Sequence, residues 1–186
     1  MTDLQSLVPP TCDGLAEVLE TAGAWDKPSL CEKWLVRHVV AHMTMPVRLT
    51  PEQFGAELAA AGGDFGVLSD TVAARDASLP VEDLLDQLRS PKLHAWQPPG
   101  GGAAGALSHA VIHSLDVTIA LGLPTVAPEE AVTAVLDLLT AANGAWFGVD
   151  LTDVRLEATD TAWSWGSGGR TVRTDSGSLV AFLSGR

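Results

Sequence analysis

The stretch Ala103–Leu121 reads AAGALSHAVIHSLDVTIAL, and Asp116 is its only charged residue. Gly122 follows it and Pro124 lies just beyond, so a helix over these residues is expected to end there. A helix that is apolar almost all round is usually buried at the centre of its domain. The stretch therefore predicts the central helix of a helical domain.

Apolar residues at helical spacing predict further helices on both sides of this stretch. Pro9 and Pro10 are expected to start, kink or divide the first of them. Ser29 and Glu32 have the capping-box spacing, which favours a helical turn, and Pro46 is expected to kink or end the next helix. The expected helices cover residues 3–23, 34–48, 51–61, 65–77, 81–89, 129–147 and 176–183.

The pattern changes after Asp150. Residues 154–158 and 163–165 alternate in the manner of strands, and a glycine-rich turn at 166–169 precedes a third short strand at 171–173. A segment of this size cannot bury a core of its own and is expected to pack on the helices. The prediction is an all-α protein with a helical domain at 1–150 and a small β-containing extension at 151–186.

Charge and length restrict the function. The chain has 186 residues and a formal net charge of −12, which argues against binding nucleic acid or an anionic membrane surface. No apolar run approaches the roughly 18 residues of a membrane span, and the N-terminus lacks a secretory pattern. Cys12 and Cys31 are too few for a disulfide framework. We expect a cytoplasmic monomer or homodimer that acts on small molecules.

Four of the five histidines form two pairs with the spacing HxxxH, His38 with His42 and His109 with His113. Residues i and i+4 lie on one face of a helix about 6 Å apart, close enough for both imidazoles to bind one metal ion. Burying His109 and His113 in the most apolar helix costs free energy unless each has a partner. A shared metal would satisfy both.

His42 is the best third ligand, because it lies on the apolar stripe that Leu35, Val39 and Met45 form. Three neutral imidazoles leave an open coordination position, which is typical of catalytic sites. Zinc is the favoured divalent metal and nickel an alternative. The competing interpretation is that these histidines are core residues hydrogen-bonded to carbonyl groups.

The other candidates keep simpler interpretations. His38 and His94 are expected at the surface or beside a ligand. Asp116, one turn after His113, is expected to orient a histidine, to pair with Arg37, or to lie on the helix surface. Cys31 has no base or basic cluster beside it in the sequence, so we expect a structural thiol and not a nucleophile. The catalytic residues stay unassigned.

Three blocks of the sequence resemble one family. Trp25–His42 (WDKPSLCEKWLVRHVVAH) resembles the N-terminal signature of mycothiol-dependent maleylpyruvate isomerase-like proteins, within the DinB/YfiT-like superfamily of metal-binding four-helix bundles. Leu107–Gly122 and Leu156–Gly166 resemble later parts of such proteins. The resemblance implies a DinB-like four-helix bundle, with His42, His109 and His113 at the three ligand positions.

Two departures set this chain apart from the isomerases proper, which carry an acidic ligand where His109 stands and a much larger C-terminal domain. The resemblance implies an enzyme that uses a divalent metal and mycothiol for thiol addition, S-transfer or thiol-assisted isomerisation of a small electrophile. The alternatives are a metal-dependent hydrolase, in which the open site activates water, and a non-enzymatic metal- or thiol-binding module.

Overall fold

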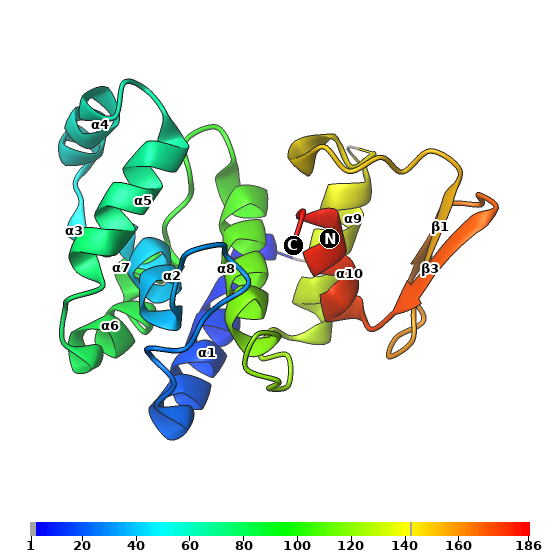
Figure 1. The fold of residues 1–186 in the computed structure, drawn as a ribbon, viewed down its shortest axis with the longest axis horizontal. Helices are drawn as coiled ribbons and strands as arrows, with labels where there is room; N and C mark the ends of the chain where they lie inside the picture. The colour runs from blue at the N-terminus through cyan, green and yellow to red at the C-terminus, as the bar shows by residue number, and fades with distance from the viewer. Residues whose placement is uncertain (1–2, 142) are drawn as a thin grey trace.

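The computed structural model describes residues 3–141 and 143–186, which are mostly helical with a small sheet near the C-terminus (Figure 1). None of the described helices is long and apolar enough to cross a membrane. The elements are η1 (Leu4–Leu7), α1 (Val8–Ala22), α2 (Val36–Met43), α3 (Met45–Arg48), α4 (Pro51–Ala60), α5 (Phe65–Asp76), α6 (Val81–Leu88), α7 (Pro91–His94), α8 (Gly102–Thr118), α9 (Glu129–Ala141), η2 (Ala145–Phe147), β1 (Val154–Ala158), β2 (Ser164–Trp165), β3 (Arg170–Thr174) and α10 (Ser176–Leu183).

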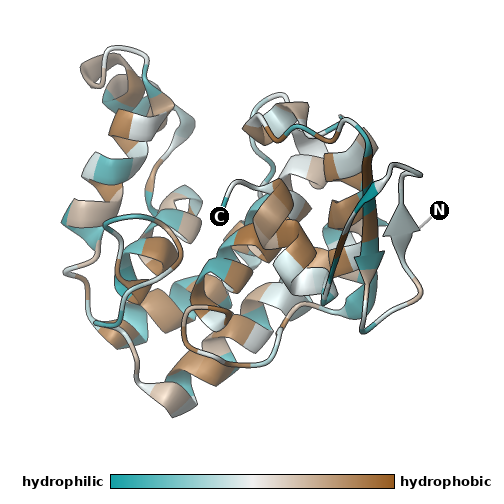
Figure 2. Cartoon of the chain, turned by 45° about the vertical axis from the view of Figure 1, so that its right-hand side comes forward, coloured by the Kyte–Doolittle hydropathy of each residue, from teal (hydrophilic) through white to brown (hydrophobic). Residues whose placement is uncertain are grey.

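The apolar stretch forms α8, which is central as expected. It packs against α1 and α2 on one side and against α9 and α10 on the other. Apolar residues of α8 are therefore buried against both groups of helices (Figure 2). The helix ends at Thr118, earlier than the sequence indicates, because the chain then closes a turn in which the Leu123 amide donates to the Thr118 carbonyl (2.8 Å). Gly122 supplies the left-handed residue of that turn (φ 64°).

The expected helical turn at Ser29–Glu32 is wrong. Pro28 and Leu35 instead form an isolated antiparallel bridge around a loop. The Ser29 hydroxyl donates to the Trp34 carbonyl (2.8 Å) and accepts from the Cys31 amide (3.2 Å), so it closes the loop and caps no helix. As a result α2 begins only at Val36.

Pro46 divides the next helix as expected. α2 ends at Met43 and the short α3 begins at Met45, because proline supplies no amide hydrogen to continue the helical ladder. The division turns the chain towards α4 and α5. These two helices pack against each other around a second, smaller apolar cluster of Met45, Leu68 and Val72.

The helix expected at 129–147 ends at Ala141. Asn143 (φ 50°) and Gly144 (φ 76°) adopt left-handed conformations that break it. A Cβ at position 144 would lie 2.1 Å from the Val149 carbonyl oxygen, so the turn requires glycine there. The chain then forms η2, whose Trp146 is 74% exposed.

The extension contains the three expected strands in the order β2-β1-β3, with β1 antiparallel to β2 and parallel to β3. α10 packs on α9 and α8. Gly177 allows this close packing, because an added Cβ would lie 2.9 Å from Leu115 Cδ2 and 3.1 Å from Thr125 Oγ1. Trp163 also anchors the extension, since its indole donates to Asp137 on α9 (2.8 Å).

Candidate metal centre

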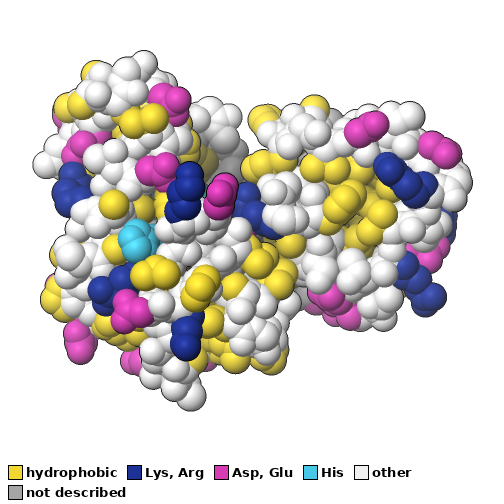
Figure 3. Space-filling model, in the orientation of Figure 1, with side chains coloured by type: hydrophobic (Ala, Val, Ile, Leu, Met, Phe, Trp, Pro, Cys, Tyr) yellow, Lys and Arg dark blue, Asp and Glu magenta, His cyan; other side chains and the backbone are white. Residues whose placement is uncertain are grey.

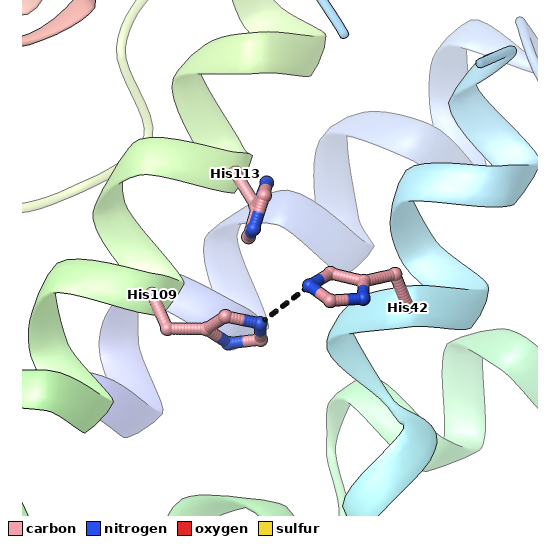
Figure 4. A group of neighbouring side chains, drawn as sticks. All are labelled: His42, His109 and His113. Atoms are coloured by element: carbon pink, nitrogen blue, oxygen red, sulfur yellow. Dashed lines mark hydrogen bonds between the residues drawn. The ribbon is translucent and has the colours of Figure 1, made fainter. Parts of the chain in front are cut away.

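Three histidines converge where α2 and α8 pack together (Figure 4). His109 and His113 lie one turn apart on α8, and His42 faces them from α2. The Nε2 atoms of His42 and His109 are 3.0 Å apart. One ring nitrogen from each of the three histidines lies within 4.8 Å of the others. The sequence-predicted residues therefore come together as one cluster.

Burial determines the protonation state of two of these rings. It lowers the pKa of His42 from 6.5 to about 3, with His113 adding to the effect. Burial, followed by the neighbouring His113 and His42, lowers the pKa of His109 well below 6.5. Both imidazoles are therefore neutral at pH 7, which is the form that binds a metal.

The donor set fits a divalent ion. Two nitrogens bound to one tetrahedral zinc at about 2.0–2.1 Å would be roughly 3.3 Å apart, close to the 3.0 Å that separates the two Nε2 atoms. Nδ1 of His42 is buried and has no hydrogen-bond partner among the described residues. No carbonyl group therefore fixes the tautomer of this ring, in contrast to the usual arrangement of a structural core histidine.

Asp116 orients the third imidazole ring, that of His113. Its carboxylate is 1% exposed and accepts from Nδ1 of His113 (2.8 Å), which leaves Nε2 of that ring free to act as a ligand. Burial would raise the pKa of Asp116, but hydrogen bonds from His113 and Arg186 outweigh it and lower the pKa well below 3.8. The carboxylate is thus ionised. Of the three expected roles, orienting a histidine is the one that its contacts match.

The expected pairing of Asp116 with Arg37 is wrong, because Arg37 pairs with Asp26 (3.3 Å). The cation at Asp116 is Arg186, which donates from Nε (2.7 Å) and Nη2 (3.0 Å). Sequence reasoning missed this residue. The pairing spans seventy positions and follows no periodicity, so only the packing of α10 on α8 reveals it.

Cys31 lies beside the same carboxylate. Its thiol donates to Asp116 Oδ2 (3.1 Å), and the sulfur, His113 and Asp116 form a second close group of ligand-type atoms. Burial, followed by the charge of Asp116, raises the pKa of Cys31 to about 12. The thiol is therefore protonated at neutral pH and is a poor nucleophile.

The two remaining histidines lie outside the cluster. Nδ1 of His38 accepts from the Leu35 amide (3.2 Å) at the start of α2. Nε2 of His94 contacts the Leu88 carbonyl (2.9 Å). Aromatic rings instead surround the three-histidine cluster: Trp34 and Phe65 lie 5.2 and 6.3 Å from His42, and Trp96 lies 5.5 Å from His109, measured between ring centroids.

Comparison with known families supports the resemblance seen in the sequence. Residues 10–96 match the family model of the mycothiol maleylpyruvate isomerase N-terminal domain. The matched segment includes His42 and the loop that carries Cys31, and it ends before α8. The chain has no significant similarity to a curated protein or to a solved structure. The match supports, over these residues, the family expected from the sequence.

Proposed function

We propose, on the basis of this family match, that the chain is an enzyme that uses a divalent metal and a low-molecular-weight thiol, mycothiol by family analogy. His42, His109 and His113 would hold the metal, with zinc favoured. The observation that carries the proposal is the convergence of three imidazole rings, two of them held neutral by burial. Residues 1–150 would form a DinB-like bundle and residues 151–186 its extension.

The metal, when bound, would lower the pKa of the thiol and so supply a thiolate at neutral pH. The chain's own residues prepare for this. Burial keeps His42 and His109 deprotonated, and Asp116 with Arg186 fixes the tautomer of His113. Because an imidazole that binds a metal through a ring nitrogen carries no charge, three such ligands would leave the charge of the ion to act on the sulfur. Cys31 stays protonated and takes no part in the chemistry.

In the proposed reaction the sulfur of the thiol bonds to an electrophilic carbon, and the thiol proton passes to solvent. In a substitution, the leaving group departs with the electron pair of the broken bond. In an addition, the neighbouring carbon takes a proton from solvent. In an isomerisation, the sulfur leaves again after rotation about the former double bond, so the thiol is regenerated.

Cobalt substitution tests the proposal. A thiolate bound to cobalt produces an intense near-ultraviolet charge-transfer band, so adding mycothiol or N-acetylcysteine to the cobalt-loaded protein should bring up the band with one equivalent per chain. N-acetylserine, which differs only in the sulfur, is the matched control and should give no band. Absence of the band, together with thiol-independent hydrolysis of an ester or amide, would favour the hydrolase alternative.

A further inference from the structure

A cleft of about 610 Å³ lies between the N-terminal half of α8, the end of α9 and η2. The surface is notched where these segments face each other (Figure 3). Cavities that bind small molecules commonly have volumes of about 300–1,000 Å³ and mostly apolar walls with few polar groups. The cleft has this character, and the proposed metal centre does not use it.

The two walls of the cleft differ in a way that suits a flat apolar guest. On the α8 side, Ala104, Gly105 and Ser108 have small side chains that leave the space open. On the opposite side stand Trp146 and Phe147, which are 74% and 45% exposed and are among the most exposed large apolar side chains of the described chain. Exposed aromatic rings that face an open space are typical of binding surfaces.

The cleft and the histidine cluster share α8, although no histidine is among the described residues that line the cleft. Ser108 precedes His109 directly, and Gly105 lies one helical turn before it. Gly105 shares the helix face of the two ligands, whereas Ala104 and Ser108 lie on the neighbouring face and form the rest of this wall. A molecule in the cleft would lie against the same two turns of helix that present His109.

The charges of the residues that line the cleft limit the kind of molecule that it can bind. None of the described residues that line the cleft is charged. A substrate with carboxylate groups would thus find no cation in the cleft to neutralise it, and burying an unpaired charge is costly.

We propose that this cleft binds the electrophilic substrate, and that this substrate is an uncharged aromatic compound held between the small face of α8 and Trp146 with Phe147. That the bound molecule is the substrate of the enzyme rests on the proposed function. The binding site itself follows from the cleft and is testable without the metal.

A matched pair of fluorescent probes tests the class of guest. N-phenyl-1-naphthylamine is uncharged, and 8-anilino-1-naphthalenesulfonate adds a sulfonate to the same aromatic framework. We expect the neutral probe to bind the metal-free protein at least about tenfold more tightly than the sulfonate. Equal or tighter binding of the sulfonate would overturn the assignment of an uncharged guest.

Two variants test the location. Ala104→Trp should fill the cleft and weaken binding of the neutral probe at least about tenfold, while Trp146→Ala removes one wall and should weaken it several-fold. Ala59→Trp places the same bulk on an exposed position of α4 and is the matched control. Trp146 is largely exposed, so its removal leaves the fold intact even if Ala104→Trp disturbs it. Unchanged binding in Trp146→Ala would contradict the location.

The thiol titration separates the two proposals. Ala104→Trp should keep the cobalt–thiolate band while losing the neutral probe. If the wild-type protein gave no band but bound the probe in the cleft, the thiol function would fail and the binding site would stand. A concentration-dependent dimer in light scattering that Ala104→Trp dissociates would show that a second copy fills the cleft, and would overturn the proposal.

Discussion

Arg186 donates two hydrogen bonds to Asp116, at 2.7 and 3.0 Å, across seventy positions of the chain. The contact joins the segment after α10 to the turn of α8 that carries His113. Because Asp116 also accepts from Nδ1 of His113 (2.8 Å), the guanidinium and the imidazole share one buried carboxylate. The orientation of one proposed ligand therefore depends on how the C-terminal extension packs.

Loss of one imidazole should empty the proposed centre. His113→Ala leaves two ligands, so we expect less than about a tenth of an equivalent of zinc in protein purified without an affinity tag, measured by elemental analysis. His38→Ala is the matched control, because His38 lies on the same helix as His42 but outside the cluster. A full equivalent of zinc in His113→Ala would place the site elsewhere.

Asp116→Asn should weaken metal binding without removing a ligand. The amide keeps the volume but loses the charge that holds the Nδ1–H tautomer of His113, and such changes typically cost 10–100-fold in affinity. Competition with a chromophoric chelator measures the loss. Asp137→Asn, at the carboxylate that accepts from Trp163, should leave zinc affinity unchanged. Equal affinities in both variants would mean that Asp116 has no orienting role.

Cys31 should react slowly with alkylating agents. A thiol with a pKa of about 12 is almost entirely protonated at pH 8, so iodoacetamide should modify it at least about 100-fold more slowly than it modifies N-acetylcysteine. Mass spectrometry of the intact protein follows the reaction. Cys31→Ala should retain zinc and most thiol-dependent turnover. Complete loss of turnover in a folded, zinc-loaded variant would make Cys31 the nucleophile after all.

Asp76 should contribute stability that depends on pH. Burial would raise its pKa, but hydrogen bonds from Arg75 and Arg48 outweigh burial and lower the pKa below 3.8. Its contribution is therefore complete above about pH 4 and is lost as the pH falls through the lowered value. Asp76→Ala should cost about 3 kcal/mol at pH 7.

Urea unfolding of the wild type and Asp76→Ala at pH 7 and pH 3 measures this effect. The difference between their free energies of unfolding should shrink at pH 3. Asp86→Ala, at an exposed aspartate of α6, should change stability little at either pH. A difference that stayed constant with pH would remove the electrostatic explanation.

The extension should unfold together with the helices. Leu156 is fully buried in β1, so Leu156→Ala should cost about 2–5 kcal/mol. We expect a single cooperative transition, seen alike by circular dichroism and tryptophan fluorescence. Thr171→Ala, at an exposed position of β3, should stay within about 0.5 kcal/mol of the wild type. Two separate transitions in Leu156→Ala would show that the extension folds as an independent unit.

Hydrophobic periodicity predicted the helices well because most of them bury one continuous apolar face. It placed α8 within a few residues at both ends. It failed where local hydrogen bonds compete with the helix, as at Ser29, whose hydroxyl closes a loop instead of capping a turn. It also extended α9 past Asn143 and Gly144, where backbone conformation and a close approach to Val149 end the helix.

The histidine cluster could be predicted for a related reason. His109 and His113 share a helix face by spacing alone, and His42 lies on an apolar stripe that must face the interior. Of the residues that support the cluster, Asp116 was a candidate because it follows His113 by about one turn, but Arg186 could not be predicted in the same way. Arg186 meets Asp116 only because two distant helices pack together, and no periodic pattern encodes such a contact.

Gly177 sets how closely α10 approaches α8, and this spacing brings Arg186 to Asp116. Coupling between two sites is reciprocal in free energy. If docking of the extension strengthens metal binding, metal binding must strengthen docking by the same factor. Amide hydrogens of α10 should then exchange more slowly in the metal-loaded protein, so the extension would report on the occupancy of a centre to which it contributes no ligand.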